Sequence, residues 1–376
     1  MSPSKPTGSR LGLFRIKNRL AAPGVGQNMA LPLDSDNPPM EARPVSNLPE
    51  GEQWRYEPKW DGFRCLAFRD GGNIELRSKS GQNLGRYFPD VVAALAASSA
   101  QQFVLDGEII IPIERRLSFE ALQLRLHPAA SRVNKLAAEH PAVYILFDLL
   151  VSPNGKLLTD LPFTERRKAL EAFYATESGI PAIRLSPSTA SRADALGWLD
   201  RLGGDIDGII AKRADLPYLS GSRDGMQKYK LTRTADCVVG GFRYNANSPL
   251  AGSLLLGLYD DEGLLNHVGF TATIPAAEKP ALTRRLEQLV EPPGFTGRAP
   301  GGPSRWSTER SGEWQPLRPE LVAEVRYDHV SEGRFRHGTT LLRWRPDKAP
   351  RQCTFDQLPA ARGGALDLLD DSSGPK

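Results

Sequence analysis

The stretch Glu57-Pro58-Lys59-Trp60-Asp61-Gly62-Phe63-Arg64 places a primary amine between an extended entry and an Asp-Gly pair. Proline biases the residue before it toward extended backbone. Asp and Gly are common turn residues. A lysine amine that has lost its proton is a nucleophile able to attack phosphorus. The segment from Lys59 to Gly62 alone is equally consistent with an exposed β-turn, so its meaning depends on the motifs downstream of it in the chain.

Six further motifs occur in a fixed order. They are Arg77-Ser78-Lys79-Ser80-Gly81, Leu105-Asp106-Gly107-Glu108, Tyr144-Ile145-Leu146-Phe147-Asp148, Asp207-Gly208-Ile209-Ile210-Ala211-Lys212, Gln227-Lys228-Tyr229-Lys230 and Arg343-Trp344-Arg345-Pro346-Asp347-Lys348. With them the chain, from about residue 39 to residue 348, resembles the covalent nucleotidyltransferases. Within that superfamily it is similar to small bacterial ATP-dependent DNA ligases, the type that includes ligase C and the ligase domain of ligase D. One departure is Asp207, because the fourth motif of the family usually begins with Glu.

Composition sets the broad class. The chain has 376 residues, of which 40% are hydrophobic and 8% aromatic, so it can form packed cores in two domains. Its net charge of +4 is permissive for nucleic-acid binding without establishing it. Residues 1–30 carry no acidic residue, and a DNA-contacting arm and a disordered leader both remain open for them. Their cations are Lys5, Arg10, Arg15, Lys17 and Arg19.

The patterning predicts an α+β fold. Residues 1–38 read as a flexible basic segment, rich in Pro, Gly, Ser and Asn. Residues 39–234 alternate strands and helices, as expected for an adenylyltransferase (nucleotidyltransferase) domain with antiparallel sheets flanked by helices. Residues 235–358 contain five short strands and one helix, which fits an OB-fold barrel. Residues 232–236 would be the hinge, and residues 359–376 a flexible C-terminal tail. Helices are expected near 90–98, 118–126, 164–174 and 192–202.

The resemblance implies the catalytic roles. Lys59 would attack the α-phosphorus of ATP and carry AMP as a phosphoramide. Lys228 and Lys230 flank Tyr229, so in a strand both ammoniums lie on one face, where they would neutralise the α-phosphate. An exposed strand edge protected by lysines is the alternative reading of that pair. Glu108 and Asp207 occupy the family's carboxylate positions for Mg²⁺ or Mn²⁺, which prefer oxygen ligands.

The remaining roles concern the nucleotide and the DNA end. Glu57 would read the adenine amino group, and Asp61 would orient the nick. Phe147 would stack on adenine, although its apolar strand fits a core position equally well. Arg64 would contact the ribose, whereas Arg77 and Lys212 would contact phosphate. Arg345 and Lys348, with Arg343, would orient the departing pyrophosphate when the barrel domain closes.

The resemblance implies that the chain joins 5′-phosphate and 3′-OH ends in duplex DNA during repair, through a lysyl-AMP and a DNA-adenylate. An RNA ligase, an mRNA-capping guanylyltransferase and a non-catalytic nucleic-acid-binding relative are the alternatives. Expected partners are nicked or broken duplex DNA and a Ku-type end-binding protein. No apolar run reaches the ~20 residues that a membrane-spanning helix needs. We expect a cytoplasmic, nucleoid-associated monomer, whose separated cysteines Cys65, Cys237 and Cys353 are reduced thiols.

Overall fold

The computed structural model describes residues 31–202, 206–301, 313–331, 333–336, 338–358 and 364–371. The basic residues between Lys5 and Arg19 therefore lie outside the described residues. The strands before the expected hinge are β1 (Arg43–Val45), β2 (Trp54–Trp60), β3 (Phe63–Asp70), β4 (Asn73–Ser78), β5 (Gln102–Ile110), β6 (Pro112–Ile113), β7 (Arg116–Leu117), β8 (Val143–Val151), β9 (Ile183–Leu185), β10 (Ile206–Arg213) and β11 (Met226–Tyr229). The helices of this part are α1 (Pro89–Ala96), α2 (Phe119–Arg125), α3 (Ala130–Glu139), α4 (Phe163–Glu177) and α5 (Arg192–Leu202).

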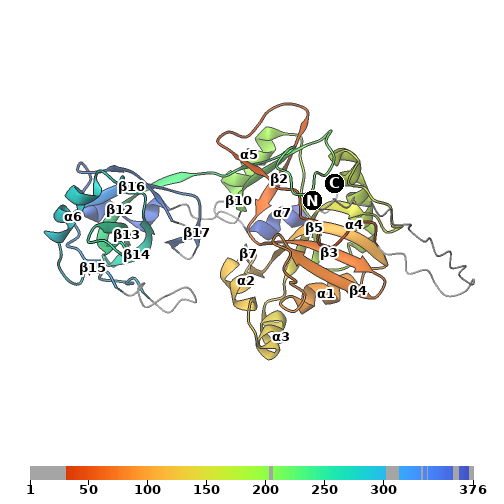
Figure 1. The fold of residues 1–376 in the computed structure, drawn as a ribbon, viewed down its shortest axis with the longest axis horizontal. Coiled ribbons are helices and arrows are strands. Elements are labelled where there is room, and N and C mark those ends of the chain that lie inside the picture. The colour runs from red at the N-terminus through yellow and green to blue at the C-terminus, as the bar shows by residue number, and fades with distance from the viewer. Residues whose placement is uncertain are drawn as a thin grey trace, which may run out of the picture. The chain divides into compact units, whose positions relative to one another are not determined.

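A five-stranded sheet in the order β4-β3-β5-β8-β9 forms one layer. Figure 1 shows β3, β4 and β5 side by side. α1 packs on β4 and α4 packs on β8 and β9. α1 begins with Pro89, whose missing N–H costs nothing in a first turn. Val91 and Leu95, four residues apart, form its buried side. They share one apolar core with Leu170 and Phe173 of α4.

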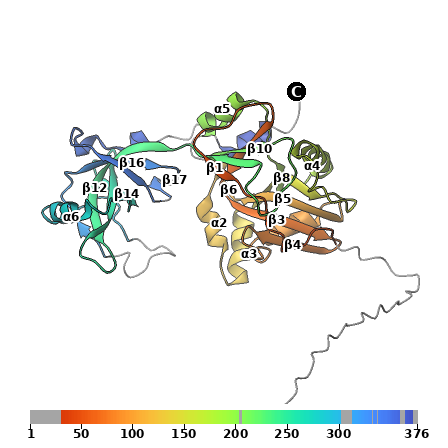
Figure 2. The same cartoon turned by 45° about the horizontal axis from the view of Figure 1, so that its top comes forward.

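A four-stranded sheet in the order β1-β11-β10-β2 forms the second layer. β2 is an edge strand, which is where a strand tolerates Pro58. α5 contacts both β10 and β2, and it lies beside β10 in both Figure 1 and Figure 2. Most pairings are antiparallel, as expected, but β1 with β11 and β8 with β9 are parallel. The α+β prediction is confirmed, with mixed rather than purely antiparallel sheets.

Two glycines lie where the chain turns: Gly62 where it passes from one sheet to the other, and Gly71 within a hairpin of the five-stranded sheet. Gly62 lies in the bend between β2 and β3, and a Cβ there would collide with the carbonyl oxygen of Ile109. Gly62 is therefore required by close packing against β5 rather than by an exposed turn. Gly71 has a φ of 60° in the turn between β3 and β4, which confirms the hairpin that Asp70-Gly71-Gly72 predicts.

The C-terminal part forms the expected barrel. Its strands are β12 (Arg233–Tyr244), β13 (Ala251–Tyr259), β14 (Leu265–Thr271), β15 (Gln315–Pro316), β16 (Val322–Tyr327), β17 (Val330–Ser331), β18 (Arg334–Phe335) and β19 (Thr340–Trp344). Its helices are α6 (Lys279–Glu287) and the short 3₁₀ turns η2 (Pro350–Gln352) and η3 (Phe355–Gln357). The sheet runs β14-β13-β12-β16-β19. A bridge between Thr271 and Thr339 joins its two ends and closes the barrel. α6 packs on β13, near the rim of the barrel in Figure 2.

Both expected flexible ends need correction. Leu31 and Leu33 pack against a core that includes Met40 and Tyr218, so the described part of the 1–38 segment is not a free arm. Helix α7 (Ala365–Asp371) forms inside the expected tail. Leu368 of α7 is buried in the core beneath β2 and β10. This segment has apolar residues three and four apart, which is helical spacing, but the neighbouring Gly and Pro residues favoured the prediction of a flexible tail.

Within the described ranges, no helix has the length and apolar character needed to cross a bilayer. Cys65, Cys237 and Cys353 are buried free thiols, in agreement with the sequence-based expectation.

Candidate active site

A cavity of about 240 Å³ opens between the two sheets. Seven residues that the sequence nominated line it together, although they come from six different strands. Its lining consists of Glu41, Ala42, Glu57, Pro58, Lys59, Trp60, Arg64, Lys79, Glu108, Phe147, Ile210, Lys212, Met226 and Lys228.

One wall is a row of residues across the four-stranded sheet. Glu57 of β2 lies opposite Ile210 of β10, which lies opposite Lys228 of β11. Residues two apart in a strand share a face, so Lys59 follows Glu57 on the same wall. Burial, and then the positive charge of Lys59, hold the pKa of Lys228 below its ordinary value. The wall therefore carries the Glu57 carboxylate on β2 and the Lys228 ammonium across the sheet on β11.

The second wall comes from the five-stranded sheet. Arg64 of β3 pairs in register with Glu108 of β5. The Arg64 guanidinium donates two hydrogen bonds to Asp106, of 3.0 and 2.6 Å, and lies 5.4 Å from the centroid of the Phe147 ring. Arg64 is thus fixed in place beside an aromatic ring that lines the cavity.

Lys59 is held by Asp207, the first residue of the fourth motif. Lys59 Nζ donates to Asp207 Oδ2 at 2.6 Å, and Lys230 Nζ lies 3.2 Å from the same oxygen. Burial disfavours the Asp207 carboxylate, but the two ammoniums outweigh burial and hold the pKa of Asp207 well below its usual range. Asp207 Oδ1 is buried and accepts no hydrogen bond from the described residues.

Lys212 lies elsewhere than expected. Its ammonium contacts Glu57 Oε2 at 2.8 Å and donates to the carbonyl oxygen of Phe147 at 3.0 Å. It is also 4.7 Å from the centroid of the Phe147 ring. Lys212 therefore lies beside Glu57, where its charge offsets that carboxylate, and its contact with phosphate stays a prediction.

Arg77 also differs from the expectation. Its guanidinium pairs with Glu75 at 2.5 Å and donates to the carbonyl oxygen of Gly81 at 2.9 Å. Arg77 is not among the residues that line the cavity, whereas Lys79 from the same motif is. Lys79 forms an ion pair of 3.0 Å with Glu41. Lys79, rather than Arg77, is therefore the cation of this motif that faces the cavity.

Three residues near the site were not expected from the sequence. Arg336 donates to the Asp61 carboxylate, although the two residues are 275 positions apart. His329 is buried, with ring nitrogens 3.8 Å from Asp61 and 3.9 Å from Asp207. Asp328 accepts a hydrogen bond of 3.0 Å from Lys230. The histidine spacing suggests only surface or core positions, and no local pattern identifies partners so far apart in the chain.

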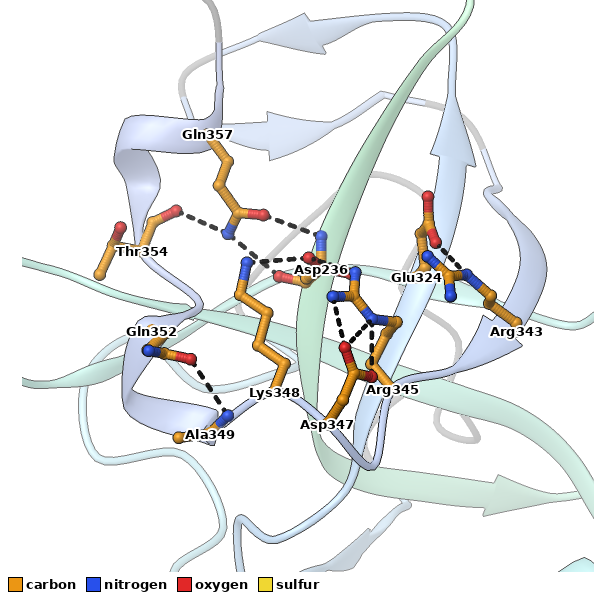
Figure 3. A network of polar contacts seen from close by, with 10 residues as sticks. All are labelled: Asp236, Glu324, Arg343, Arg345, Asp347, Lys348, Ala349, Gln352, Thr354 and Gln357. Atoms are coloured by element: carbon orange, nitrogen blue, oxygen red, sulfur yellow. Dashed lines mark hydrogen bonds and ion pairs between the residues drawn. The ribbon is translucent and has the colours of Figure 1, made fainter.

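The cations of the last motif form a separate network within the barrel, drawn in Figure 3. Arg345 donates to both carboxylate oxygens of Asp236, at 2.9 and 3.0 Å, and Lys348 donates to Asp236 at 2.8 Å. Asp347 binds another side of the Arg345 guanidinium. The side-chain amide of Gln357 makes two hydrogen bonds with the backbone of Asp236: Gln357 Oε1 accepts from the Asp236 N–H, and Gln357 Nε2 donates to the Asp236 carbonyl oxygen. The carboxylate of Asp236 thus binds both Arg345 and Lys348, whereas Arg343 pairs with Glu324.

Glu108 and Asp207 are the carboxylates that the sequence assigns to a divalent cation. Burial raises the pKa of Glu108 to about 8, against the opposing charges of Lys59 and Arg64. No cluster of three or more His, Cys, Asp or Glu side chains with metal-binding geometry occurs in the part of the chain that the structure describes. Mg²⁺ usually keeps several waters and takes one or two protein carboxylates. Glu108 lines the cavity, and Asp207 Oδ1 has no hydrogen-bond partner among the described residues, so these two carboxylates are the candidates for holding it, although Asp207 is not among the lining residues.

Comparison with known proteins identifies the family. The family model described as ATP dependent DNA ligase domain matches residues 39–230, and the one described as ATP dependent DNA ligase C terminal region matches residues 247–348. DNA ligase C2 of Mycolicibacterium smegmatis is 45% identical over 346 residues, which cover 88% of this chain and 96% of that protein. The chain belongs to the ATP-dependent DNA ligases.

The chain is also similar to a second curated protein and to a solved structure. It is 30% identical over 319 residues to the multifunctional non-homologous end joining protein LigD of Pseudomonas aeruginosa, covering 83% of this chain and 36% of that protein. A solved structure titled Pmar-Lig_Pre. matches with a TM-score of 0.53 and 16% identity, covering 82% of this chain and 68% of that one. At that identity the match shows the fold alone. The predicted family and enzyme class are confirmed.

Proposed function

We propose that this ligase joins a 5′-phosphate to a 3′-OH in duplex DNA through an AMP carried on Lys59. The observation that carries the proposal is the position of Lys59. Its ammonium lies on the wall of the cavity two residues from the buried acceptor Glu57, and it is held at 2.6 Å by Asp207. An amine so placed can reach the α-phosphate of a nucleotide whose base lies at the Glu57 end.

In the first step the Lys59 amine gives up a proton to solvent and attacks the α-phosphorus of ATP. The N–P bond forms as the bond from the α-phosphorus to the bridging oxygen breaks, and pyrophosphate leaves with that electron pair. Asp207 orients the amine through its hydrogen bond. Lys228, on the same wall, offsets the charge that grows on the phosphate oxygens.

In the second step an oxygen of the DNA 5′-phosphate attacks the phosphorus of lysyl-AMP, and the N–P bond breaks to release Lys59. The 3′-OH then attacks the 5′-phosphorus, loses its proton, and AMP leaves as the phosphodiester forms. Asp61 lies next to the nucleophile in sequence and carries an ion pair with Arg336. We assign Asp61 to orienting the nick at this stage.

Glu108 and Asp207 would hold Mg²⁺ or Mn²⁺, which would neutralise phosphate charge during transfer. Glu57 and Phe147 would select the base. A carboxylate accepts from the 6-amino group of adenine but opposes the acceptor oxygen of guanine. This preference for ATP separates the ligase from a capping guanylyltransferase. Arg345 and Lys348 would act on pyrophosphate during the first step.

The cellular role is also a proposal. One relative is named as a non-homologous end joining protein, which supports a role in break repair with a Ku-type end-binding partner. We further propose that the ligase acts as a monomer in the cytoplasm at the nucleoid.

The proposal is tested by sealing a nicked duplex that carries a labelled 5′-phosphate. ATP with Mg²⁺ should convert the label to a phosphatase-resistant phosphodiester, and GTP should not. A parallel nick with a 3′-terminal ribonucleotide, and a nicked RNA duplex, test the RNA-ligase alternative. Efficient joining of RNA but not DNA, or joining driven by GTP, would contradict the proposal. An absence of joining with every substrate would favour the non-catalytic alternative.

A further inference from the structure

Arg167 of α4 lies directly behind the carboxylate of Glu57. Its terminal NH1 nitrogen is 3.5 Å from Glu57 Oε1. Glu57 has a side-chain exposure of 2% and Arg167 of 11%. Both atoms are buried and make no hydrogen bond with the described residues. Buried polar atoms are nearly always hydrogen-bonded. Glu57 lines the cavity, so its Oε1 is the acceptor that a ligand bound there would satisfy.

The other sides of both groups are already occupied. Glu57 Oε2 contacts Lys212 at 2.8 Å. Arg167 Nε donates to Glu171 Oε1 at 2.7 Å. Charges therefore alternate from the surface inward, from Glu171 to Arg167, Glu57 and Lys212. In this arrangement Oε1 is the oxygen of Glu57 that remains available to a donor.

The charge state of Glu57 decides what Oε1 can do. An ionised carboxylate only accepts hydrogen bonds, whereas a protonated one also donates. Burial raises the pKa of Glu57, and the positive charges of Lys212 and then Arg167 oppose that rise. The buried side chain thus relies on both neighbours to remain an acceptor.

We propose that Arg167 is a positioning residue that sets base specificity, because it holds Glu57 as a hydrogen-bond acceptor for the 6-amino group of adenine. This inference rests on the proposed adenylylation of Lys59. Without Arg167, the Glu57 carboxylate loses one of its two cations, and Oε1 becomes able to carry a proton. A protonated Oε1 no longer favours the adenine amino group and tolerates the oxygen of guanine.

The test is single-turnover formation of the lysyl adduct with three nucleotides: ATP, purine riboside triphosphate, which lacks the 6-amino group, and GTP. Arg167→Gln should lower kcat/KM for ATP by about tenfold, as expected for a lost charge-assisted contact, and leave purine riboside triphosphate nearly unchanged. Arg167→Lys, which keeps the charge, should recover most of the preference. Glu57→Gln should erase the same preference, and the double variant should lose little more. Lys168→Gln, at an exposed position on the same helix, is the matched control.

Equal loss with ATP and purine riboside triphosphate would overturn the inference and leave Arg167 a structural residue. An unchanged preference in Arg167→Gln would overturn it as well. In both cases the parent enzyme still labels with ATP, so the proposed function survives. Failure of the parent to form any adduct would instead overturn the proposed function together with this inference.

Discussion

Lys59 and Asp207 form a 2.6 Å ion pair across neighbouring strands, at the point where the pairing of β2 with β10 shifts register. Gly208 lies opposite Lys59, and Ile206 lies opposite Trp60. Asp207 is therefore an extra residue of β10 with no partner in the register of β2. A bulge of this kind re-aims a side chain toward a site. The bulge brings the short Asp207 side chain within hydrogen-bond distance of the nucleophile.

Replacement of Asp207 tests that relationship. Asp207→Asn removes the charge that orients Lys59 and one of the two carboxylates assigned to the metal. We expect single-turnover nick sealing to fall by about 10- to 100-fold. Asp207→Glu keeps the charge and should retain substantial activity. Sealing by Asp207→Asn at the parental rate across a Mg²⁺ titration would show that Asp207 has neither role.

A methyl group at Gly208 should disrupt the same bulge. Gly208 has a φ of 144°, and a Cβ there would collide with the carbonyl oxygen of Tyr229. Gly208→Ala should therefore separate β10 from β11 and displace Asp207, with loss of lysyl-AMP formation and a lower melting temperature. Gly72→Ala is the control, because its Cβ would meet no atom within 4 Å. Equal behaviour of the two variants in adduct formation and thermal unfolding would argue against a strained bulge.

The barrel cations should matter for one chemical step. Arg345→Ala or Lys348→Ala removes a charge assigned to pyrophosphate, and adenylylation by ATP should slow by about 100-fold. Sealing of a nick that already carries AMP should continue, because no pyrophosphate is involved. Glu278→Ala, at the start of α6, serves as the control substitution. If both reactions fall together, the cluster around Asp236 serves DNA binding or the fold instead.

Acid should destabilise the ligase partly through His267. Burial, and then Arg334, lower the pKa of His267 to about 3, from an ordinary value near 6.5. Below pH 6.5 the unfolded chain binds a proton that the folded chain does not, so this histidine's contribution to stability is present above pH 6.5 and is lost as pH falls toward 3. The expected slope is about 1 kcal/mol per pH unit within that window.

Urea unfolding at pH 7.5, 5.5 and 4.5 measures that contribution. The parent and His267→Gln should differ less in their free energy of unfolding as the pH falls. Phe270→Leu changes a residue of the same strand that does not titrate. Its free energy of unfolding should differ from that of the parent by the same amount at every pH. A pH-independent difference for His267→Gln would mean that the histidine takes up its proton equally well in both states.

Local patterns predicted one wall of the site and missed the contacts that cross the chain. The resemblance to the ligase motifs predicted Glu57, Lys59 and Lys228, and strand alternation placed Lys228 and Lys230 on one face. The contact of Lys212 with Glu57 was missed because neither segment alone indicates which residues of the two strands lie opposite one another. Asp61 and Arg336 are 275 positions apart, beyond the reach of any local periodicity. Arg77 and Lys79 share one motif, and only the three-dimensional path of their loop decides which of them faces the cavity.

The same distinction applies to the fold. The hairpin at Gly71 and the five barrel strands follow from turn residues and alternation. Helix α7 was missed although Ala365, Leu368 and Leu369 have helical spacing, because a helix of seven residues becomes stable only when it is packed. Its packing partner is the core beneath β2 and β10, which is distant in sequence.

The most direct test of the central claim uses ATP labelled at the α-phosphate. The parent should retain label as an acid-labile adduct that survives denaturing electrophoresis, and peptide mapping should place the label on Lys59. Lys59→Ala should retain none, whereas Lys168→Ala, at an exposed position on α4, should label like the parent. Equal retention of label by Lys59→Ala, or a label mapped to another residue, would contradict the account.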